Sequence, residues 1–379
     1  MTRPHTIADI PTPALLVDVP AMERNIRRMA EFFAAGPCKL RPHFKAHKTP
    51  EIARRQLAAA PTGARPGGSL RASACTGLTC ATVAEAEVAA DFCDDILIAN
   101  EVLGPGKAAR VAALARHIDV KVAVDSQAAL QDIAAAASDA AVEVGVLVDV
   151  NVGLPRCGVA PGDEALALAR RVADTSGVRL CGVMGYEGHV VGIEDRARRE
   201  ANARQAIDRL LSTVRVIRDA GLRCDIVSAG GTGTYDITGR MDGVTEIQAG
   251  SYVLMDTAYA KLDIPFEQAL SVLGTVLSRP TPTICVADCG HKSCTMDHGN
   301  PSVKDVEGAS ALFLSDEHVT ISLPADAQIE PGGRIQLWPS HIDPTINLHD
   351  VLYAVDGETV IDLWPVSARG YPEQRAERA

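Results

Sequence analysis

Residues 119–151 read DVKVAVDSQAALQDIAAAASDAAVEVGVLVDVN, and this stretch sets the expectation for the fold. It has short apolar runs at 119–124 and 142–151 on either side of an alanine-rich helical segment at 126–137. Val146, Leu147 and Val148 are apolar at consecutive positions, as in a strand buried on both faces. A helix between two such strands predicts a strand–helix–strand unit of a parallel sheet.

The same alternation continues on both sides of this stretch. Helical segments are predicted at 83–91, 106–116, 126–137, 164–173 and 195–220. Eight strands are predicted, at 40–44, 77–81, 95–99, 119–124, 142–151, 178–186, 224–229 and 245–250. Eight such units in about 230 residues match the length of a (β/α)8 TIM barrel. A doubly wound open sheet is the alternative α/β fold, and the count of eight favours the barrel.

The pattern changes near Ser271, where strands follow one another closely with turn residues between them. Strands are predicted at 283–288, 311–314, 318–323, 334–338, 351–355 and 359–364. This part is expected to form a second, β-rich C-terminal domain. A further strand at 14–17 could belong to either domain. We place the barrel at 20–265 and the β-rich domain at 1–19 and 266–379.

Composition and charge narrow the class of protein. The chain has 379 residues, of which 47% are apolar and 22% charged, so it can bury a large core. Its net charge of −11 argues against nucleic acid or an anionic membrane as the main partner. No apolar run approaches the roughly 18 residues of a membrane span, and the start lacks a signal-peptide core. We expect a soluble, cytoplasmic protein whose ten scattered cysteines are reduced or buried.

The densest group of candidate catalytic residues is at 41–48, RPHFKAHK. In the barrel interpretation, Lys45 lies at the carboxyl end of the first strand, where barrel enzymes place their active sites. Partial desolvation and neighbouring cations would favour its neutral amine, which can act as a Schiff-base nucleophile. The alternative is a solvated basic patch, and the placement of Lys45 favours the catalytic interpretation.

Two glycine-rich turns follow the seventh and eighth predicted strands, at 228–234 (SAGGTGT) and 250–252 (GSY). Glycines let backbone N–H groups converge on an anion, and these strand ends are the usual phosphate site of a TIM barrel. Ordinary tight turns are the alternative. A lysine and a phosphate site in one barrel indicate pyridoxal 5′-phosphate (PLP), whose aldehyde and phosphate need both.

Other candidate residues lie elsewhere. Alternate residues along a strand face the same side, so in an extended segment His341 and Asp343 can point at one ion together, and the pair suits Mn²⁺, Mg²⁺ or Co²⁺. Arg156, after the fifth strand, could pair with a phenolate or carboxylate, or form a salt bridge at the rim. Tyr186 and His189 follow the sixth strand, where a tyrosine could pack on a cofactor ring and a histidine could move protons.

Five ordered motifs together resemble the D-threonine aldolase and D-serine dehydratase family, PLP enzymes with the alanine racemase-like fold. They are 41–48 (RPHFKAHK), 230–233 (GGTG), 248–252 (QAGSY), 315–318 (SDEH) and 339–344 (PSHIDP), and the likeness runs from Thr12 to Gly370. The resemblance implies a homodimer, by analogy with enzymes of this architecture. Two positions depart from the family pattern, Ala81 in place of a glutamine and Gly192 in place of a histidine.

The resemblance also assigns roles to residues. It implies that Lys45 holds PLP covalently and that His341 and Asp343 bind a divalent metal. The dehydratase branch typically has cysteine at the second metal position, so Asp343 favours the aldolase branch, with Mn²⁺ preferred over Mg²⁺ or Co²⁺. The residues that hold the cofactor, together with Arg156 and Tyr186, would be Thr232, Gly233, Gly250, Ser251 and Tyr259.

The expected reaction is retro-aldol cleavage of D-threonine, or another D-3-hydroxy amino acid, to glycine and an aldehyde. His189 or a metal-bound water would remove the hydroxyl proton. The same residues could instead run D-serine dehydration to pyruvate and ammonia, or cleavage of D-3-hydroxyaspartate. A non-catalytic PLP-carrier protein is the alternative from another class, and the β-rich domain with His341 and Asp343 argues against it.

Overall fold

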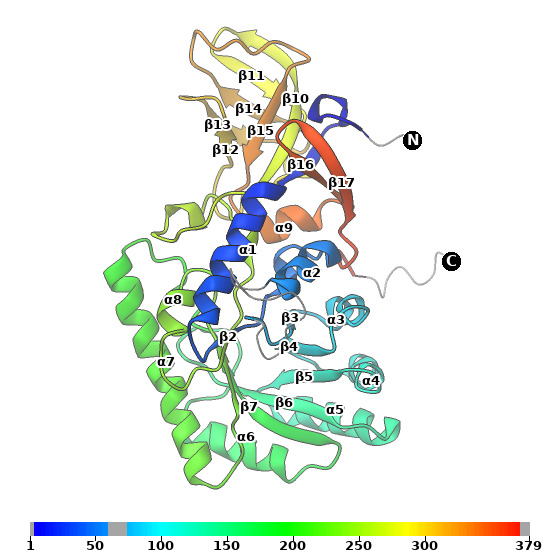
Figure 1. The fold of residues 1–379 in the computed structure, drawn as a ribbon, viewed down its shortest axis with the longest axis vertical. Helices are drawn as coiled ribbons and strands as arrows, with labels where there is room; N and C mark the ends of the chain where they lie inside the picture. Colours follow the sequence, from blue (N-terminus) through cyan, green and yellow to red (C-terminus); the bar gives the residue numbers. More distant parts are fainter. Residues whose placement is uncertain (1–3, 60–73, 372–379) are drawn as a thin grey trace. The chain divides into compact units, whose positions relative to one another are not determined.

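The computed structural model describes residues 4–59 and 74–371 (Figure 1). The chain divides into two compact units. The barrel unit comprises Met29–Lys45 and Ile52–Gly250, and the β unit comprises Met1–Arg28, Ala46–Glu51 and Ser251–Ala379. The domain limits predicted from the sequence stay predictions.

In the described part of the barrel unit, eight parallel strands form one sheet in the order β2-β9-β8-β7-β6-β5-β4-β3. Parallel bridges from Leu40 to Cys75 and from His43 to Thr79 join β2 to the β3 edge, so the sheet closes. The barrel prediction is confirmed, and the open-sheet alternative is wrong. The strands are β2 (Lys39–Leu40), β3 (Leu78–Cys80), β4 (Asp95–Glu101), β5 (Asp119–Val124), β6 (Val144–Asp149), β7 (Val178–Gly185), β8 (Ile226–Ala229) and β9 (Glu246–Ile247).

Helices connect these strands, and side-chain caps begin several of them. Thr82 accepts a hydrogen bond from the Glu85 N–H, and Asp195 accepts one from the Arg198 N–H. Inside the barrel, a buried cluster takes apolar residues from four neighbouring strands, β4 to β7. The helices are α2 (Pro50–Ala58), α3 (Val83–Ala89), α4 (Pro105–Leu114), α5 (Gln127–Ala140), α6 (Asp163–Ala173), α7 (Arg196–Asp219) and α8 (Tyr235–Thr238).

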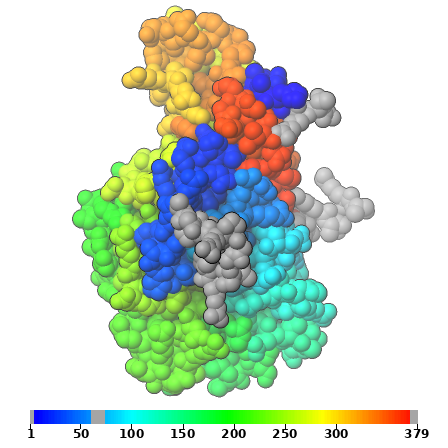
Figure 2. Space-filling view, viewed as in Figure 1, coloured from blue at the N-terminus to red at the C-terminus, as the bar shows by residue number. Residues whose placement is uncertain are grey.

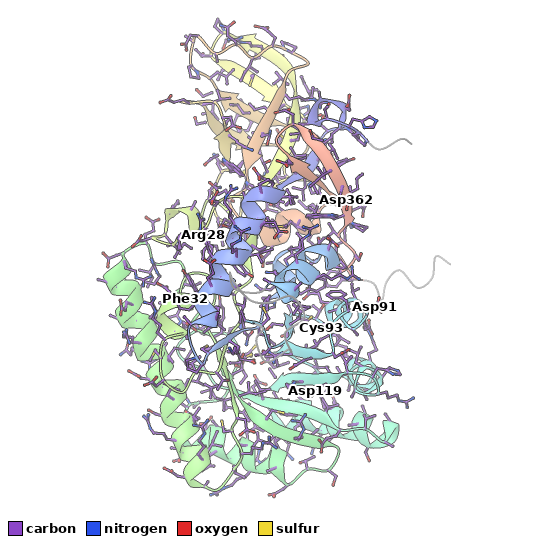
Figure 3. The ribbon with its side chains drawn as sticks, viewed as in Figure 1. Arg28, Phe32, Asp91, Cys93, Asp119 and Asp362 are labelled. Atoms are coloured by element: carbon purple, nitrogen blue, oxygen red, sulfur yellow. The ribbon has the colours of Figure 1, made fainter. Side chains whose placement is uncertain are left out.

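An ionic layer lies near the amino ends of β4, β5 and β9. The Arg41 guanidinium, 1% exposed, lies 2.7 Å from Asp95 Oδ1 and 2.9 Å from Glu246 Oε1. Lys121 Nζ lies 2.9 Å from Asp95 Oδ1 and 2.7 Å from Asp119 Oδ2. Asp119 is one of the residues labelled in Figure 3. These charges are paired, which offsets the cost of taking them out of water. The layer is a structural feature at the end of the barrel opposite the carboxyl ends of the strands.

Helix α1 (Val19–Ala34) is amphipathic and can be followed as the blue band in Figure 2. Met22, Ile26 and Phe33 are buried at helical spacing. On the exposed side, the guanidiniums of Arg24 and Arg28 both lie 2.7 Å from the Glu267 carboxylate. The helix therefore has one apolar face for packing and one basic face that binds a single acidic side chain.

The described part of the β unit contains a nine-stranded sheet. Strand β1 lies between β10, to which it is antiparallel, and β16, to which it is parallel. The strand expected at 14–17 thus belongs to this unit. Strands β10 and β12 were not predicted. The strands are β1 (Ala14–Asp18), β10 (Leu270–Thr281), β11 (Ile284–Ala287), β12 (Ser302–Lys304), β13 (Ser310–Leu314), β14 (Val319–Ser322), β15 (Arg334–Trp338), β16 (Val351–Asp356) and β17 (Thr359–Pro365).

The composition led to expectations about the cysteines and about membrane spans, and the structure tests both. All ten cysteines lie in the described residues and are free thiols, most of them buried. Burial raises the pKa of the Cys38 thiol to about 12, with Glu246 adding to the effect, so this thiol stays protonated. Across residues 4–59 and 74–371, each helix is too short or too polar to cross a membrane.

Candidate active site

Lys45 lies just beyond the first barrel strand. The main-chain pairing of β2 continues past its last residue, since the Arg41 N–H donates to Ile247 O (2.8 Å) and the His43 N–H to Ala249 O (3.1 Å). Lys45 then lies in a short 3-10 turn, Phe44–Ala46, in which Phe44 is fully buried. The Lys45 side chain is exposed in this structure, so the partial burial expected from the sequence is not seen. Its covalent role stays a prediction.

A buried carboxylate fixes the glycine-rich turn that follows β8. Glu187 has no exposed surface, and it accepts hydrogen bonds from the Gly230 N–H (3.1 Å) and the hydroxyls of Thr234 and Thr238 (2.7 Å each). Gly230 has a φ of +75°, and a Cβ there would lie 2.7 Å from Ile247 Cδ1. The turn therefore needs glycine at this position. The sequence interpretation overlooked Glu187 because its three donors are distant along the chain.

The ends of β8 and β9 provide backbone donors for an anion. These strands are neighbours, and Ala229 pairs with Ile247 at their carboxyl ends. Among the described residues, no acceptor receives the N–H of Gly233 or that of Gly250. Thr232, next to Gly233, is buried. Uncommitted N–H groups at adjacent strand ends fit the phosphate of PLP.

Tyr186 brings a second part of the predicted site to this turn. It follows β7 directly, and Cβ atoms built at Gly231 and Gly188 would lie 3.3 Å from its Cε2 and 2.4 Å from its Cε1. The ring therefore lies against both glycines. The Arg156 guanidinium lies 5.6 Å from the centroid of the same ring, in cation–π contact. The structure thus brings together Tyr186, Arg156 and the turn at 230–233.

Acidic residues that the sequence interpretation missed lie at the carboxyl ends of β4, β5 and β6. Single ligand atoms of Glu101, Asp125 and Cys157 lie within 4.8 Å of one another. Asp149 is buried, and burial followed by the charge of Glu101 raises its pKa to about 8, although Arg156 opposes the shift. At neutral pH Asp149 therefore retains its proton.

His189 lies in the segment that follows Tyr186, and its side chain is exposed. A Cβ built at Gly153 would lie 3.0 Å from His189 Nε2 and 3.2 Å from Arg209 Nη1. Arg209 also donates to the carbonyl of Val152 (3.0 Å). The contacts of the imidazole are thus with the loop after β6, and its role as a base stays a prediction.

In the β unit, His341 and Asp343 lie close together, although not on a strand. His341 is the N-cap of α9 (Ile342–Asn347) and Asp343 is in its first turn, so the extended geometry by which the sequence analysis paired them is wrong. Pro344 follows in the same turn, where a fixed φ and a missing N–H are tolerated. His341 Nε2 lies 3.9 Å from Asp343 Oδ1. Both atoms can bond to one ion, since each metal–ligand bond is about 2.0–2.2 Å long.

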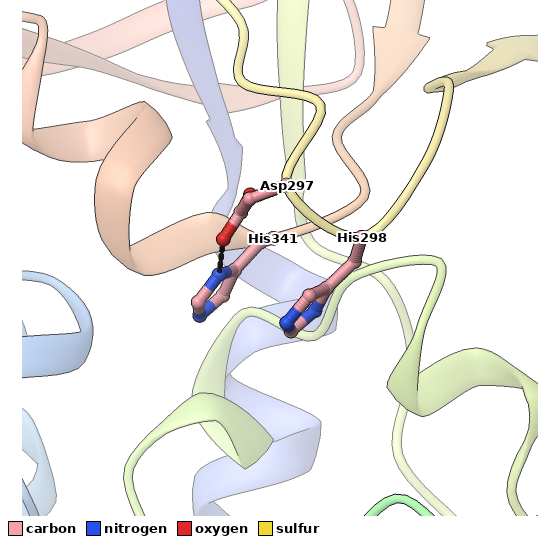
Figure 4. Close-up of side chains that lie close together, drawn as sticks. All are labelled: Asp297, His298 and His341. Carbon is pink, nitrogen blue, oxygen red and sulfur yellow. Dashed lines mark hydrogen bonds and ion pairs between the residues drawn. The ribbon is translucent and has the colours of Figure 1, made fainter.

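Two more residues beside His341 were not predicted (Figure 4). Asp297 Oδ2 lies 2.5 Å from His341 Nδ1, and the ring of His298 stacks on that of His341 with centroids 4.3 Å apart and planes 5° apart. Burial alone would raise the pKa of Asp297, but its hydrogen bond to His341 and the neighbouring His341 and His298 rings lower it. Ligand atoms of Asp297, His298 and His341 lie within 4.8 Å of one another, so His341 is part of a local cluster of polar side chains.

A buried carboxylate connects two of the motifs within the β unit. Asp256 accepts from the Tyr259 N–H (2.9 Å) and from the Ile342 N–H (3.4 Å). The segment that carries Ser251 and Tyr259 is thereby tied to the start of α9. Ser251 opens a 3-10 turn, Ser251–Val253, and its carbonyl accepts from the Met255 N–H (2.7 Å).

The closed parallel barrel has a lysine after its first strand and a glycine-rich turn after its seventh, as expected for the class of alanine racemase-like proteins. The family model of the alanine racemase N-terminal domain matches residues 17–258, and the chain belongs to this family. A second model, described as a putative serine dehydratase domain, matches residues 269–355. The fold class predicted from the sequence is confirmed.

Named relatives narrow the class further. A D-threonine aldolase of Arthrobacter sp is 38% identical over 96% of this chain and 94% of its own. A 3-hydroxy-D-aspartate aldolase of Paracoccus denitrificans is 32% identical over 96% of this chain and 93% of its own. The solved D-threonine aldolase of Filomicrobium marinum superposes with a TM-score of 0.91, at 38% identity, over 97% of this chain and 98% of its own. The resemblance stated from the five motifs is thereby confirmed.

Proposed function

We propose that this protein is a PLP- and divalent-metal-dependent D-threonine aldolase that cleaves D-threonine, and other D-3-hydroxy amino acids, to glycine and an aldehyde. The observation that carries the proposal is the 38% identity to a D-threonine aldolase over 96% of the chain. The presence of Asp343 beside His341 supports the aldolase branch.

The barrel residues fit PLP. Bound PLP would supply an electron sink for the carbanion left at Cα when the Cα–Cβ bond breaks. Lys45 would provide the amine that holds the cofactor, and the N–H groups of Gly233 and Gly250 would bind its phosphate. The buried Thr232 lies beside these donors. Arg156 and Tyr186 would contact the cofactor ring, while Ser251 and Tyr259 are assigned by the family resemblance.

The β-unit residues fit a hard or borderline divalent cation. His341 and Asp343 offer one imidazole nitrogen and one carboxylate oxygen, a mixed set that suits Mn²⁺, with Mg²⁺ and Co²⁺ as alternatives. A cation there would supply Lewis acidity toward the substrate hydroxyl. His189 is assigned the removal of the hydroxyl proton, which accompanies formation of the aldehyde carbonyl. We further propose that the protein is a cytoplasmic homodimer.

Two related reactions and one non-enzymatic role are the alternatives. D-Serine dehydration to pyruvate and ammonia is favoured by the match of residues 269–355 to a putative serine dehydratase domain. Cleavage of D-3-hydroxyaspartate is favoured by the 32% identity to a 3-hydroxy-D-aspartate aldolase. A PLP-carrier protein without catalysis would have no use for His341 and Asp343, and this disfavours it.

Product analysis separates these reactions. The purified protein, loaded with PLP and Mn²⁺, is incubated with D-threonine, D-serine and D-3-hydroxyaspartate, with and without EDTA. We expect equimolar glycine and acetaldehyde from D-threonine, loss of activity with EDTA, and none in Lys45→Ala. Pyruvate from D-serine without glycine from D-threonine would reassign the protein as a dehydratase. Activity of Lys45→Ala equal to the wild type would refute the assignment of the cofactor lysine.

A further inference from the structure

The two ring nitrogens of His341 have different surroundings. Nδ1 lies 2.5 Å from Asp297 Oδ2, within hydrogen-bond distance of a carboxylate. Nε2 lies 3.9 Å from Asp343 Oδ1, a distance that one shared cation can bridge. Figure 4 shows the Asp297 carboxylate at one end of the His341 ring, with the other ring nitrogen directed away from it. One nitrogen is therefore held by protein, while the other faces the second predicted ligand.

This arrangement determines which nitrogen can bind a metal. A neutral imidazole carries one hydrogen, and a carboxylate can only accept, so a hydrogen bond to Asp297 places that hydrogen on Nδ1. The lone pair of Nε2 is then available to a cation. Histidines that bind metals commonly donate their other ring N–H to a carboxylate, which orients the ring and raises its basicity as a ligand.

The loop that carries Asp297 is fixed to α9. The Thr295 N–H lies 3.3 Å from Thr345 Oγ1, and the two threonine hydroxyls lie 3.0 Å apart. Thr345 Oγ1 in turn donates to the His341 carbonyl (2.8 Å). Asp297 is therefore held relative to the backbone of His341 by contacts that do not involve the imidazole.

His298 stacks on the face of the His341 ring. Its ring is parallel to that of His341 within 5°, with centroids 4.3 Å apart. A cation bound to Nε2 lies in the plane of the His341 ring, and hence outside the parallel plane of His298. In this rotamer His298 packs against His341 and does not bind the same cation.

We propose that Asp297 is a positioning residue of the metal site, which keeps the hydrogen of His341 on Nδ1 and presents Nε2 to the cation. This inference rests on the proposed function, because it assumes that His341 is a metal ligand. Asp297 acts through His341 and does not itself bind the cation or the substrate. Asp297, the hydrogen-bond partner of the predicted metal ligand His341, lies in a loop 44 residues before it in the sequence.

Metal affinity and the His341 tautomer test the proposal. Mn²⁺ is titrated into the PLP-loaded protein and free Mn²⁺ is followed by electron paramagnetic resonance, for the wild type and the variants Asp297→Ala, Asp297→Asn and His341→Ala. Because outer partners of metal-binding histidines contribute about 10–100-fold to affinity, we expect Asp297→Ala to bind Mn²⁺ weaker by that factor. Asp297→Asn should lose less, since its amide oxygen can still accept from Nδ1.

The tautomer is a readout that a merely structural role would not change. Nitrogen NMR of histidine-labelled protein without metal should show the Nδ1–H form of His341 in the wild type and in Asp297→Asn. Asp297→Ala should shift it toward the Nε2–H form. Asp326→Ala, an exposed aspartate in a turn of the same unit, is the matched control and should leave affinity and tautomer unchanged.

The outcomes separate this inference from the proposed function. If His341→Ala abolishes Mn²⁺ binding while Asp297→Ala binds within twofold of the wild type, Asp297 is not a positioning residue. Weaker binding by Asp297→Ala with an unchanged tautomer would also overturn the proposal, because Asp297 would then act as a direct ligand. If His341→Ala leaves Mn²⁺ affinity unchanged, the metal site of the proposed function is wrong, and this inference falls with it.

Discussion

Replacement of Glu187 should disrupt the turn that we assign to the cofactor phosphate. Glu187→Ala would leave three buried donors without their acceptor, the Gly230 N–H and the hydroxyls of Thr234 and Thr238. The backbone N–H cannot turn elsewhere and costs about 1–3 kcal/mol, while each hydroxyl can rotate and costs about 1 kcal/mol. We expect the free energy of unfolding to decrease by about 3–5 kcal/mol. Glu187→Gln, which loses the acceptor for one donor, should cost about 1–3 kcal/mol.

Part of this cost should appear as weaker cofactor binding, since the turn must be ordered to hold the phosphate. A loss of about 1.4–2.8 kcal/mol at the turn corresponds to a tenfold to hundredfold weaker PLP affinity. Urea unfolding and absorbance titrations measure the two effects, with pyridoxal as a ligand without phosphate that should lose less. Glu200→Ala, at an exposed ion pair on α7, is the control and should change stability by less than about 1 kcal/mol. The reasoning would be refuted if Glu187→Ala had a free energy of unfolding within 1 kcal/mol of the wild type and a PLP affinity within twofold of it.

Three further predictions concern buried ionisable side chains. Arg41→Met should lower the free energy of unfolding by about 3–5 kcal/mol, because it leaves the buried Glu246 carboxylate unpaired, whereas Arg41→Met with Glu246→Leu should lie within about 1 kcal/mol of the wild type. If urea titrations showed the same loss of unfolding free energy for the single and the double variant, this prediction would be contradicted. Since the pKa of Asp149 is raised to about 8 from an ordinary 3.8, the native protein holds a proton that the unfolded chain has released. The contribution of this proton to the free energy of unfolding is complete below about pH 4, and it is lost as the pH rises to about 8. Asp149→Asn should therefore flatten the decline in stability between pH 5 and pH 8, and an unchanged slope would exclude Asp149 as its source. Asp256→Ala should weaken Mn²⁺ binding, because it removes the acceptor of the Ile342 N–H at the start of α9, and an unchanged affinity would show that this bond does not position the metal ligands.

The barrel could be predicted because its signal is local. Each strand is a short apolar run, and residues such as Val146 to Val148 are buried on both faces, as their sequence indicates. The β unit was harder to predict. Strand β12 has only three residues, and β10 contains Gly274 and Pro280, which weaken a strand pattern.

The site was only partly predictable, for a physical reason. Lys45 and the glycine turns follow strands, so their positions come from the order of elements. The contacts of Glu187 and Asp297 join residues more than 40 positions apart, and no local pattern reports them. His341 and Asp343 were expected to share a side because alternate residues of an extended segment do. The first turn of α9 brings the same two side chains together by another geometry.

The placement of β1 has a consequence for synthesis of the chain. Leu15 pairs with Val272 on one side and with Leu352 on the other, so β1 acquires both of its partners only after all the barrel strands have been synthesised. Barrel strands, by contrast, pair with strands made just before or after them, apart from the closing pair. A ribosome-bound chain can therefore complete most of the barrel while β1 still has an unsatisfied edge on each side. Until its partners are made, β1 is an apolar segment with unpaired edges that can associate with neighbouring nascent chains.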